Sequence, residues 1–355
     1  MFLATKELKY TKGKFALIIA VIVLISYLVY FLTSLAYGLS SSYTNAVEKW
    51  KADEIIITVD SNDNMMMSYM TQNDFDSISV NGKKAKLGLF PAVINNPLSE
   101  DVLASRVDVY FFGIEDSFIM PNELKNLNLT GNKVIVDEEL KKEGYKVGDL
   151  FGVTGSDQQY EIIGFSTKST YQTAPVVYMS LKTWQEYRYG NVNTPDLYSG
   201  VIVQGSSSNL PSNLLSYITD DYISTLPGYT AQVLTFTTMI IFLIIIVAFV
   251  LGIFIYVLTI QKTSMFGVMK AQGISNGYIA GSVIVQTFLL VLIGIILGLA
   301  LTVITGIFLG EVIPFAINYL FYVIITAAFF LFALFGAMFS VSAVLKIDPL
   351  RAIGG

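Results

Sequence analysis

Four long runs without a charged residue constrain this chain more than any other feature of its sequence. Crossing a hydrocarbon core of about 30 Å takes about 20 helical residues, and each run is longer than that. The runs cover residues 15–37, 231–260, 279–304 and 319–345. A single run of this kind could be a buried helix of a soluble protein, but four of them predict an integral membrane α-helical protein with four transmembrane helices. The composition agrees, because only 14% of the residues are charged, against about 25% in soluble domains.

The basic residues predict how these helices are oriented. A cleaved signal peptide is the alternative for the first run, but its apolar region is normally about 7–15 residues long, so 15–37 favours an uncleaved anchor. Lys and Arg near helix ends stay in the cytoplasm. They occur before the first run, in the loop 261–278 and in the tail 346–355. We therefore expect a multi-pass protein of the cell membrane with both termini in the cytoplasm.

The long segment between the first two runs is expected outside the cytoplasm. Residues 39–230 hold 24 of the 27 acidic residues but only 14 of the 22 basic ones, and this acidity argues against a nucleic-acid partner. Short β-rich runs alternate with turn residues along the segment. The stretches 137–145, 181–190 and 212–226 read as helices, the last one running back toward the membrane. The sequence thus predicts a large α+β extracytoplasmic domain inserted between helices 1 and 2.

The expected organisation follows from these boundaries. It is a cytoplasmic amphipathic segment (1–14), transmembrane helix 1 (15–37), the extracytoplasmic domain with its stalk (38–230), helix 2 (231–260), a cytoplasmic loop (261–278), helix 3 (279–304), a short extracytoplasmic loop (305–318), helix 4 (319–345) and a cytoplasmic tail (346–355).

The residue types that are missing limit the chemistry of the chain. It contains no Cys and no His, which excludes disulfides, the usual zinc sites and Cys or His nucleophiles. No G-x-x-x-x-G-K-[ST] phosphate loop occurs either. We expect no catalytic residues, no permanently bound cofactor and no ATPase activity of the chain's own.

The loop between helices 2 and 3 is the most distinctive short segment. Its sequence QKTSMFGVMKAQGISNGYI is short, basic and glycine-punctuated, with Met265, Phe266, Val268 and Met269 close together. An inert connection between two helices is the alternative. Exposed apolar residues at this density more often mark an interaction site, so we expect the loop to contact a cytosolic partner.

Three stretches resemble segments of the FtsX/MacB (type VII) class of ABC transporter permeases. They are the loop FGVMKAQGIS (266–275), the ending IDPLRAIGG (347–355) and KVIVDEELKKEGYKVGDLFGV (133–153). The order of one helix, a large outside domain and three more helices is also that of the class. The resemblance covers nearly the whole chain.

The resemblance implies partners and a mechanism. ATP would be bound and hydrolysed by a separate cytosolic ABC ATPase subunit, present as a dimer beneath two copies of this chain. Nucleotide-driven closure would move the loop and lever the outside domains, a mechanism called mechanotransmission. The ATPase-coupling residues would be Thr263, Met265, Phe266, Gly267, Val268, Met269, Lys270 and Gly273. Met265 departs from the class, which usually has glutamate there, so no salt bridge to the ATPase is expected from this position.

Within the class, FLATKELKYTKGKFALII and YVLTIQKTSMFGVMKAQGIS are most similar to the HrtB/DevC group, which includes haem-efflux permeases. Haem, or a similar amphipathic molecule of the membrane, is then the expected cargo. Without His and Cys, the axial ligands left for ferric haem are Tyr and, less suitably, Met. Tyr229 and Tyr171 are the candidates, with Lys168 as a cation that favours the phenolate, and the alternative for both tyrosines is anchoring at the membrane interface.

Other readings stay open from the sequence alone. Gly294 and Gly298 would allow close helix packing, although glycine is generally frequent in membrane helices. The methionines at 65, 66, 67 and 70 could bind haem iron, but such runs are more often adaptable apolar surface. The cargo could instead be a peptide antibiotic or a lipid. An FtsX-like activator of a cell-wall hydrolase, which transports nothing, is the alternative from another functional class.

Overall fold

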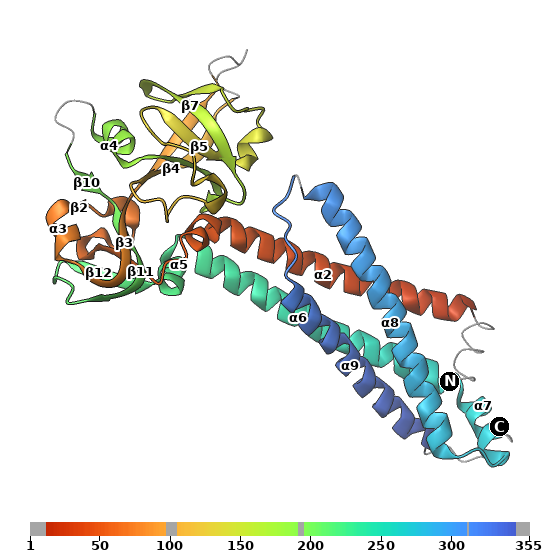
Figure 1. Ribbon diagram of the computed structural model, residues 1–355. Helices are drawn as coiled ribbons and strands as arrows, with labels where there is room; N and C mark the ends of the chain where they lie inside the picture. The colour runs from red at the N-terminus through yellow and green to blue at the C-terminus, as the bar shows by residue number, and fades with distance from the viewer. Residues whose placement is uncertain (1–11, 97–104, 191–194, 311, 346–355) are drawn as a thin grey trace. The chain divides into compact units, whose positions relative to one another are not determined.

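The structure is a computed structural model that describes residues 12–96, 105–190, 195–310 and 312–345 (Figure 1). The chain divides into two compact units, which are considered separately. One unit, the helical unit, comprises Met1–Gly38 and Val233–Gly355, and the other, the β domain, comprises Leu39–Gln232. The expected amphipathic segment 1–14 lies mostly, and the tail 346–355 wholly, outside the described residues.

Among the residues that the structure describes, four helices are long and apolar enough to cross a membrane, which confirms the predicted number of transmembrane helices. They are α2 (Lys12–Lys49), α6 (Tyr229–Ile260), α8 (Asn276–Leu309) and α9 (Tyr319–Leu345), with the short helix α7 (Thr263–Ala271) between α6 and α8. All four contribute to one buried apolar cluster, for example through Ile22, Leu251, Ile295 and Phe329. Much of their remaining apolar surface is exposed in this chain, as expected for helices that face lipid.

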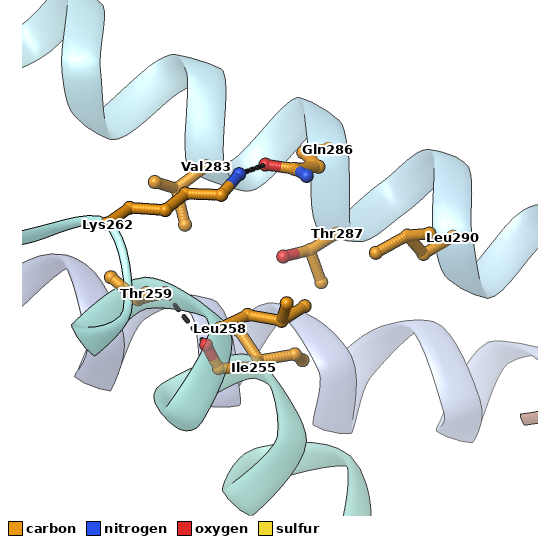
Figure 2. Close-up of a pocket in the computed structure, with 8 residues that line it drawn as sticks. All are labelled: Ile255, Leu258, Thr259, Lys262, Val283, Gln286, Thr287 and Leu290. Atoms are coloured by element: carbon orange, nitrogen blue, oxygen red, sulfur yellow. Dashed lines mark hydrogen bonds between the residues drawn. The ribbon is translucent and has the colours of Figure 1, made fainter. Parts of the chain in front are cut away.

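Polar side chains also join the helices of this unit. The hydroxyl groups of Tyr30 in α2 and Thr326 in α9 lie 2.6 Å apart, and Ser34 and Tyr322 form a second such pair at 2.5 Å. Lys262, which lies between α6 and α7, donates a hydrogen bond from Nζ to Gln286 Oε1 of α8 at 2.8 Å (Figure 2). Because hydrocarbon offers no hydrogen-bond partners, such pairs hold membrane helices in a fixed register.

The longest strand of the β domain, β3, is shared by two parts of its main sheet. Strands β3, β4, β9, β5, β7 and β6 pair in this order, and β6 pairs back to β3, so they close into a ring. The other end of β3 continues through β11 and β1 to β12. The strands are β1 (Glu54–Thr58), β2 (Met70–Thr71), β3 (Ser79–Asn95), β4 (Val107–Ile114), β5 (Lys133–Asp137), β6 (Leu150–Val153), β7 (Ser156–Ser166), β8 (Thr170–Tyr171), β9 (Ala174–Ser180), β10 (Leu197–Tyr198), β11 (Gly200–Ser208) and β12 (Leu214–Ile218).

Short helices connect these strands. They are α3 (Gln72–Ser77), α4 (Leu181–Tyr189), α5 (Thr219–Thr225) and the 3-10 turns η1 (Val59–Ser61), η2 (Met65–Met67), η3 (Asn122–Leu124) and η4 (Glu138–Lys141). The predicted mixed α+β character of this region is therefore confirmed, and the helix expected at 181–190 is α4.

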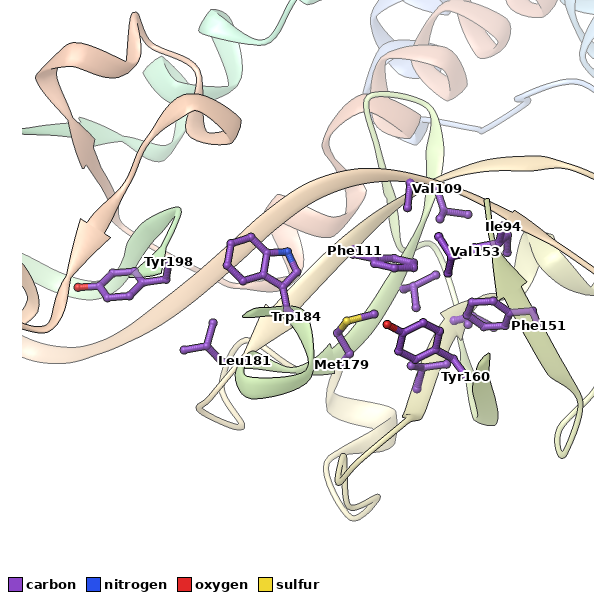
Figure 3. Close-up of a cluster of buried hydrophobic side chains, with 14 of the residues drawn as sticks. Ile94, Val109, Phe111, Phe151, Val153, Tyr160, Met179, Leu181, Trp184 and Tyr198 are labelled. Atoms are coloured by element: carbon purple, nitrogen blue, oxygen red, sulfur yellow. The ribbon is translucent and has the colours of Figure 1, made fainter. Parts of the chain in front are cut away.

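Aromatic side chains fill the inside of the ring. Tyr160 packs against Phe111 and Phe151, with ring centroids 5.8 and 5.7 Å away (Figure 3). Apolar residues of β3, β4 and β9 complete this core, for example Ile94 and Met179. The inside of the ring is thus a packed apolar core.

Two helix predictions in this domain were only partly correct. The stretch 212–226 is strand β12 followed by the seven-residue helix α5, because β12 pairs with β1 along its length, as in Ile57 opposite Leu215. The apolar residues of this stretch are compatible with one face of a strand as well as with one face of a helix. Pairing with β1 makes its first part a strand. The stretch 137–145 contains only the 3-10 turn η4, which ends at Lys141 with Lys142 as its C-cap, and Gly144 beyond it has φ +89°.

The last turn of α2 is fastened to the β domain by one lysine. Lys49 Nζ forms an ion pair with Glu123 at 3.0 Å and donates to Ser166 Oγ and Ser169 Oγ, both at 2.9 Å. It also donates to the carbonyl oxygen of Thr167. Burial by itself would raise the pKa of Glu123, but hydrogen bonds from its own backbone N–H, from Lys49 and from Thr167 hold that pKa below its usual value.

We predict that Lys49→Met destabilises the β domain by about 2 kcal/mol, because it removes hydrogen bonds from a charged donor. The half-exposed Glu123 adds little to this value. Thermal unfolding of the full chain, followed by tryptophan fluorescence, measures the effect selectively, since both tryptophans, Trp50 and Trp184, are buried in this domain. The exposed neighbour Lys51 provides the control variant Lys51→Met.

The pH dependence gives the prediction a second readout. A carboxylate with a lowered pKa in the folded state stabilises the fold above its unfolded pKa and loses this contribution as the pH falls. We therefore expect the stability difference between wild type and Lys49→Met to shrink as the pH falls through the lowered pKa of Glu123, which is depressed from about 4.5. A difference that stayed constant down to that pH would show that the ion pair contributes nothing.

Candidate functional site

The predicted coupling segment forms a short helix held by tight turns at both ends. Lys262 lies between the end of α6 and the start of α7. At the other end, Gly273 has φ +84°, and the Ile274 N–H donates to the Met269 carbonyl at 3.0 Å, which is the pattern of a left-handed helix end. The Ser275 side chain then caps the first turn of α8. The segment therefore has a defined position relative to α8.

One face of α7 packs inside its own chain. Phe266 is only 2% exposed and forms a buried cluster with Ile279 and Val283 of α8. Partly buried Met265, Met269, Ile274 and Val341 surround it. In this chain the Phe266 ring fills a site between α7 and α8, and its contact with an ATPase stays a prediction. Met265 and Met269 turn largely to the same side.

The opposite face of α7 is exposed among the residues that the structure describes. Val268 is 43% exposed, and Ser264, Ala271 and Gln272 are exposed around it. These four residues, the α7 outer face, are spaced so that they share one side of a helix. Of them only Val268 was predicted, although the helical period counted from the buried Phe266 would have found the others.

The remaining predicted coupling residues lie between these two faces. Gly267 is buried, Thr263 and Lys270 are half-buried, and Gly273 is exposed in the turn after α7. The Thr263 hydroxyl donates to the Ile260 carbonyl at 2.6 Å, so it helps to join α7 to the end of α6.

Gly294 and Gly298 lie where α8 crosses α2. A Cβ atom at Gly294 would lie 2.3 Å from Ile22 Cγ2, and one at Gly298 would lie 2.0 Å from Ser26 Oγ. The Ser26 hydroxyl also donates to the Gly294 carbonyl at 3.3 Å. The two helices are therefore in backbone contact, and the partner of this glycine pair is a helix of the same chain.

Tyr171 does not lie at a surface where it could bind cargo. It is 1% exposed, its hydroxyl lies 2.8 Å from that of Tyr222, and its ring packs edge-on against Tyr110 and Phe112. Burial raises the pKa of its phenol well above the usual range. A phenol that is buried, hydrogen-bonded and harder to ionise packs as a core residue, so the structure gives no support to the predicted role of Tyr171 as a haem ligand.

Tyr229 is better placed than Tyr171. It is the first residue of α6 and half-buried. Its hydroxyl accepts a hydrogen bond from Ser40 Oγ at 3.4 Å, and its ring centroid lies 5.9 Å from that of Tyr43. The exposed Lys168 instead lines a pocket with Glu48. Within the described part of the chain no hydrogen bond or ring contact joins Lys168 to Tyr229, so the expected support of a Tyr229 phenolate by Lys168 has no structural basis.

The methionine run does not gather around a common point. Met65 and Met70 are buried in two different apolar clusters, whereas Met67 is exposed. Met65 and Met70 thus pack in apolar cores, which is the commoner role of methionine.

Comparison with known proteins shows which sequences this chain resembles. The family of FtsX-like permease C-terminal domains matches residues 237–349, which include α7, α8, α9 and most of α6. The chain is 28% identical over 373 residues to a putative hemin transport system permease protein HrtB of Staphylococcus epidermidis ATCC 12228, covering 100% of this chain and 99% of that protein. It is 26% identical over 369 residues to the protein of the same description from Staphylococcus haemolyticus JCSC1435, with the same coverage.

Proposed function

We propose, from the premise that this chain is an FtsX-like permease, that it is the membrane subunit of an ABC-type efflux system that exports haem or a similar amphipathic molecule. The observation that carries this proposal is the full-length similarity to putative hemin transport permeases. The FtsX-like match covers only the carboxyl-terminal helices, which many permeases share. The similarity to the hemin permeases also covers the β domain. We expect permeases with different cargoes to differ more in this domain than in the carboxyl-terminal helices.

The ATPase partner follows from the same premise. The sequence contains no phosphate-binding loop, so ATP hydrolysis belongs to a cytosolic ABC subunit. We place its docking site on the α7 outer face, with both termini of the permease on the same cytoplasmic side. Two permease chains would then sit on an ATPase dimer.

Mechanotransmission is supported by the continuity of α2. The 38 residues of this helix run from the helical unit into the β domain without a break, a length of about 57 Å at 1.5 Å per residue. Lys49 fastens its last turn to the β domain. In this proposal, α2 is the segment that would carry a displacement produced by the ATPase toward the β domain.

We predict that Val268→Asp separates the permease from its ATPase while leaving the permease folded. A carboxylate in an apolar contact must lose its hydration without gaining a partner, whereas at the 43% exposed position of the free chain it stays solvated. We expect at least a tenfold loss of permease-stimulated ATP hydrolysis and loss of co-purification. Val268→Ala is the matched control, and the permease alone should hydrolyse no ATP. Unchanged stimulation in Val268→Asp would remove α7 from the docking site.

For the cargo, we predict that Tyr229→Phe weakens haem binding without changing stability. The substitution keeps the ring that packs near Tyr43 and removes only the oxygen, which is the group a ferric iron would bind. The visible spectrum of haem titrated into the purified permease measures this, and Tyr43→Phe is a control on the same aromatic pair. If Tyr229→Phe keeps the wild-type spectrum and affinity, Tyr229 is an anchor. If wild type shows no saturable haem binding, the cargo is another amphipathic molecule, such as a peptide antibiotic or a lipid.

A further inference from the structure

A small polar cavity lies among the apolar side chains at the end of α6 (Figure 2). Lys262, Gln286, Thr259 and Thr287 supply its polar lining. Its volume of about 10 Å³ is roughly the space that a single water-sized group needs. Polar and charged side chains among membrane helices are unfavourable unless they have a partner, and they usually mark a functional site.

Lys262 fixes the orientation of the Gln286 amide. An ammonium group can only donate hydrogen bonds, so the amide atom 2.8 Å from Lys262 Nζ must be the oxygen. The amide nitrogen then faces away from the lysine, as Figure 2 shows. Gln286 is only 7% exposed, and its Nε2 has no hydrogen-bond partner among the described residues. A buried N–H donor without an acceptor in the described part of the chain indicates that another molecule accepts its hydrogen bond.

The residues that line the cavity determine what kind of ligand can accept this hydrogen bond. The ligand must accept a hydrogen bond from Gln286 Nε2, and it would lie beside the positive charge of Lys262. The Thr259 hydroxyl donates its proton to the Ile255 carbonyl at 2.7 Å, so it offers no strong competing interaction. An oxygen atom that carries negative charge fits these conditions, whereas a metal cation or an ammonium group does not.

The position of the cavity along the chain narrows the ligand further. Lys262 follows the last residue of α6, Ile260, by two positions, and therefore lies where a spanning helix leaves the hydrocarbon core. Phospholipid phosphates lie at this level, and basic pockets between membrane helices are known to bind anionic headgroups.

We propose that this cavity is a binding site for an anionic phospholipid, one phosphate oxygen of which accepts the hydrogen bond that Gln286 Nε2 donates, near the charge of Lys262. The remainder of the headgroup stays at the mouth of the cavity, since the inside holds only one atom of this size. Because Lys262 directly precedes α7, the bound phosphate also fixes the first residues of the coupling helix. This inference does not depend on the cargo.

Native mass spectrometry of the permease with its ATPase partner tests the proposal, with phosphatidylglycerol and phosphatidylcholine as probes. We expect wild type to retain phosphatidylglycerol about tenfold more tightly. Lys262→Gln and Gln286→Glu should lose this preference. Gln286→Glu is the sharper variant, because its carboxylate still pairs with Lys262 but replaces the donor by an oxygen that repels phosphate. Gln261→Glu places the same charge beside Lys262 but outside the cavity lining, and should keep the preference.

Two outcomes overturn the proposal. Equal retention of both lipids by wild type would mean that the cavity holds only water. Displacement of phosphatidylglycerol by millimolar inorganic phosphate would make the site one for free phosphate. If the variants do not fold, a photoreactive phosphatidylglycerol on wild type decides instead: labelling within residues 255–290 supports the site, and labelling confined to other segments contradicts it.

Discussion

Replacing Phe266 by Asp is expected to disrupt the packing of α7 against α8 and to prevent accumulation of a correctly folded permease. The ring is 2% exposed and surrounded by apolar side chains, with Ile279 and Val283 as its buried partners. Removing a buried phenylalanine ring costs about 3–5 kcal/mol, and a carboxylate without a counter-charge in the same space adds to this cost. The effect should exceed that of any substitution on the α7 outer face.

The absence of cysteine from the chain allows a direct measurement. A single cysteine at the fully buried Ile279 would be the only thiol in the protein. We expect a maleimide to leave Ile279→Cys unlabelled in the otherwise wild-type chain and to label it once Phe266→Asp is added. Phe266→Leu, which keeps an apolar side chain, should leave the thiol protected.

The comparison with Val268→Asp makes this experiment decisive. If α7 packs as described, Phe266→Asp exposes the thiol, whereas Val268→Asp keeps it protected and loses only the ATPase. A protected thiol together with lost ATPase stimulation in Phe266→Asp would mean that this face of α7 turns toward the partner in the assembled transporter.

The sequence could specify the spanning helices because a single physical requirement defines them. A charge-free run longer than the hydrocarbon core has few alternatives, and for this reason the spans were predicted to within a few residues at most ends. The first helix is an exception, since α2 continues to Lys49. Its last turns carry charges and belong to the β domain, where the rule for membrane helices no longer applies.

The arrangement of the β domain could not be predicted in the same way. Individual strands such as β4 and β9 follow from their apolar runs, but their parallel pairing, for example Phe111 opposite Val177, joins segments far apart in the chain. The fate of Tyr171 depends on this pairing, because β8 is folded onto β9 and buries the ring. A tyrosine that looked accessible in the sequence is therefore part of a core.

The composition of α7 predicted its conformation but not what its apolar face would contact. Met265, Phe266, Val268 and Met269 predicted a helix with an apolar face, but a single sequence does not say whether such a face packs inside the chain or against a partner. The structure divides them, with Val268 alone on the exposed side. The position at which the resembling class usually has glutamate, Met265, lies on the partly buried side, which explains why an apolar residue is tolerated there.

Replacing Gly298 by Leu is the second substitution for which we expect a large effect. The close contact of α8 with α2 leaves no space for a side chain, since even a Cβ atom at this position would lie 2.0 Å from Ser26 Oγ and 3.1 Å from the Tyr27 backbone nitrogen. Overpacking of a well-packed contact costs about 1–3 kcal/mol for small additions, and a leucine must push the two helices apart. The Ser26 hydrogen bond to the Gly294 carbonyl would be lost with it.

Thermal stability of the detergent-solubilised chain, followed by loss of the monodisperse peak in size-exclusion chromatography, measures this effect. Gly281→Leu is the matched control, because Gly281 lies on the same helix and has no atom within 4 Å of an added Cβ. We expect Gly298→Leu to lose most of its folded fraction and Gly281→Leu to behave as wild type. Gly298→Ala should be intermediate, and Ser26→Gly should partly restore it by removing the atom nearest to the new methyl group. If Ser26→Gly brings no recovery, the backbone contact with Tyr27, rather than the Ser26 side chain, limits how closely α8 approaches α2.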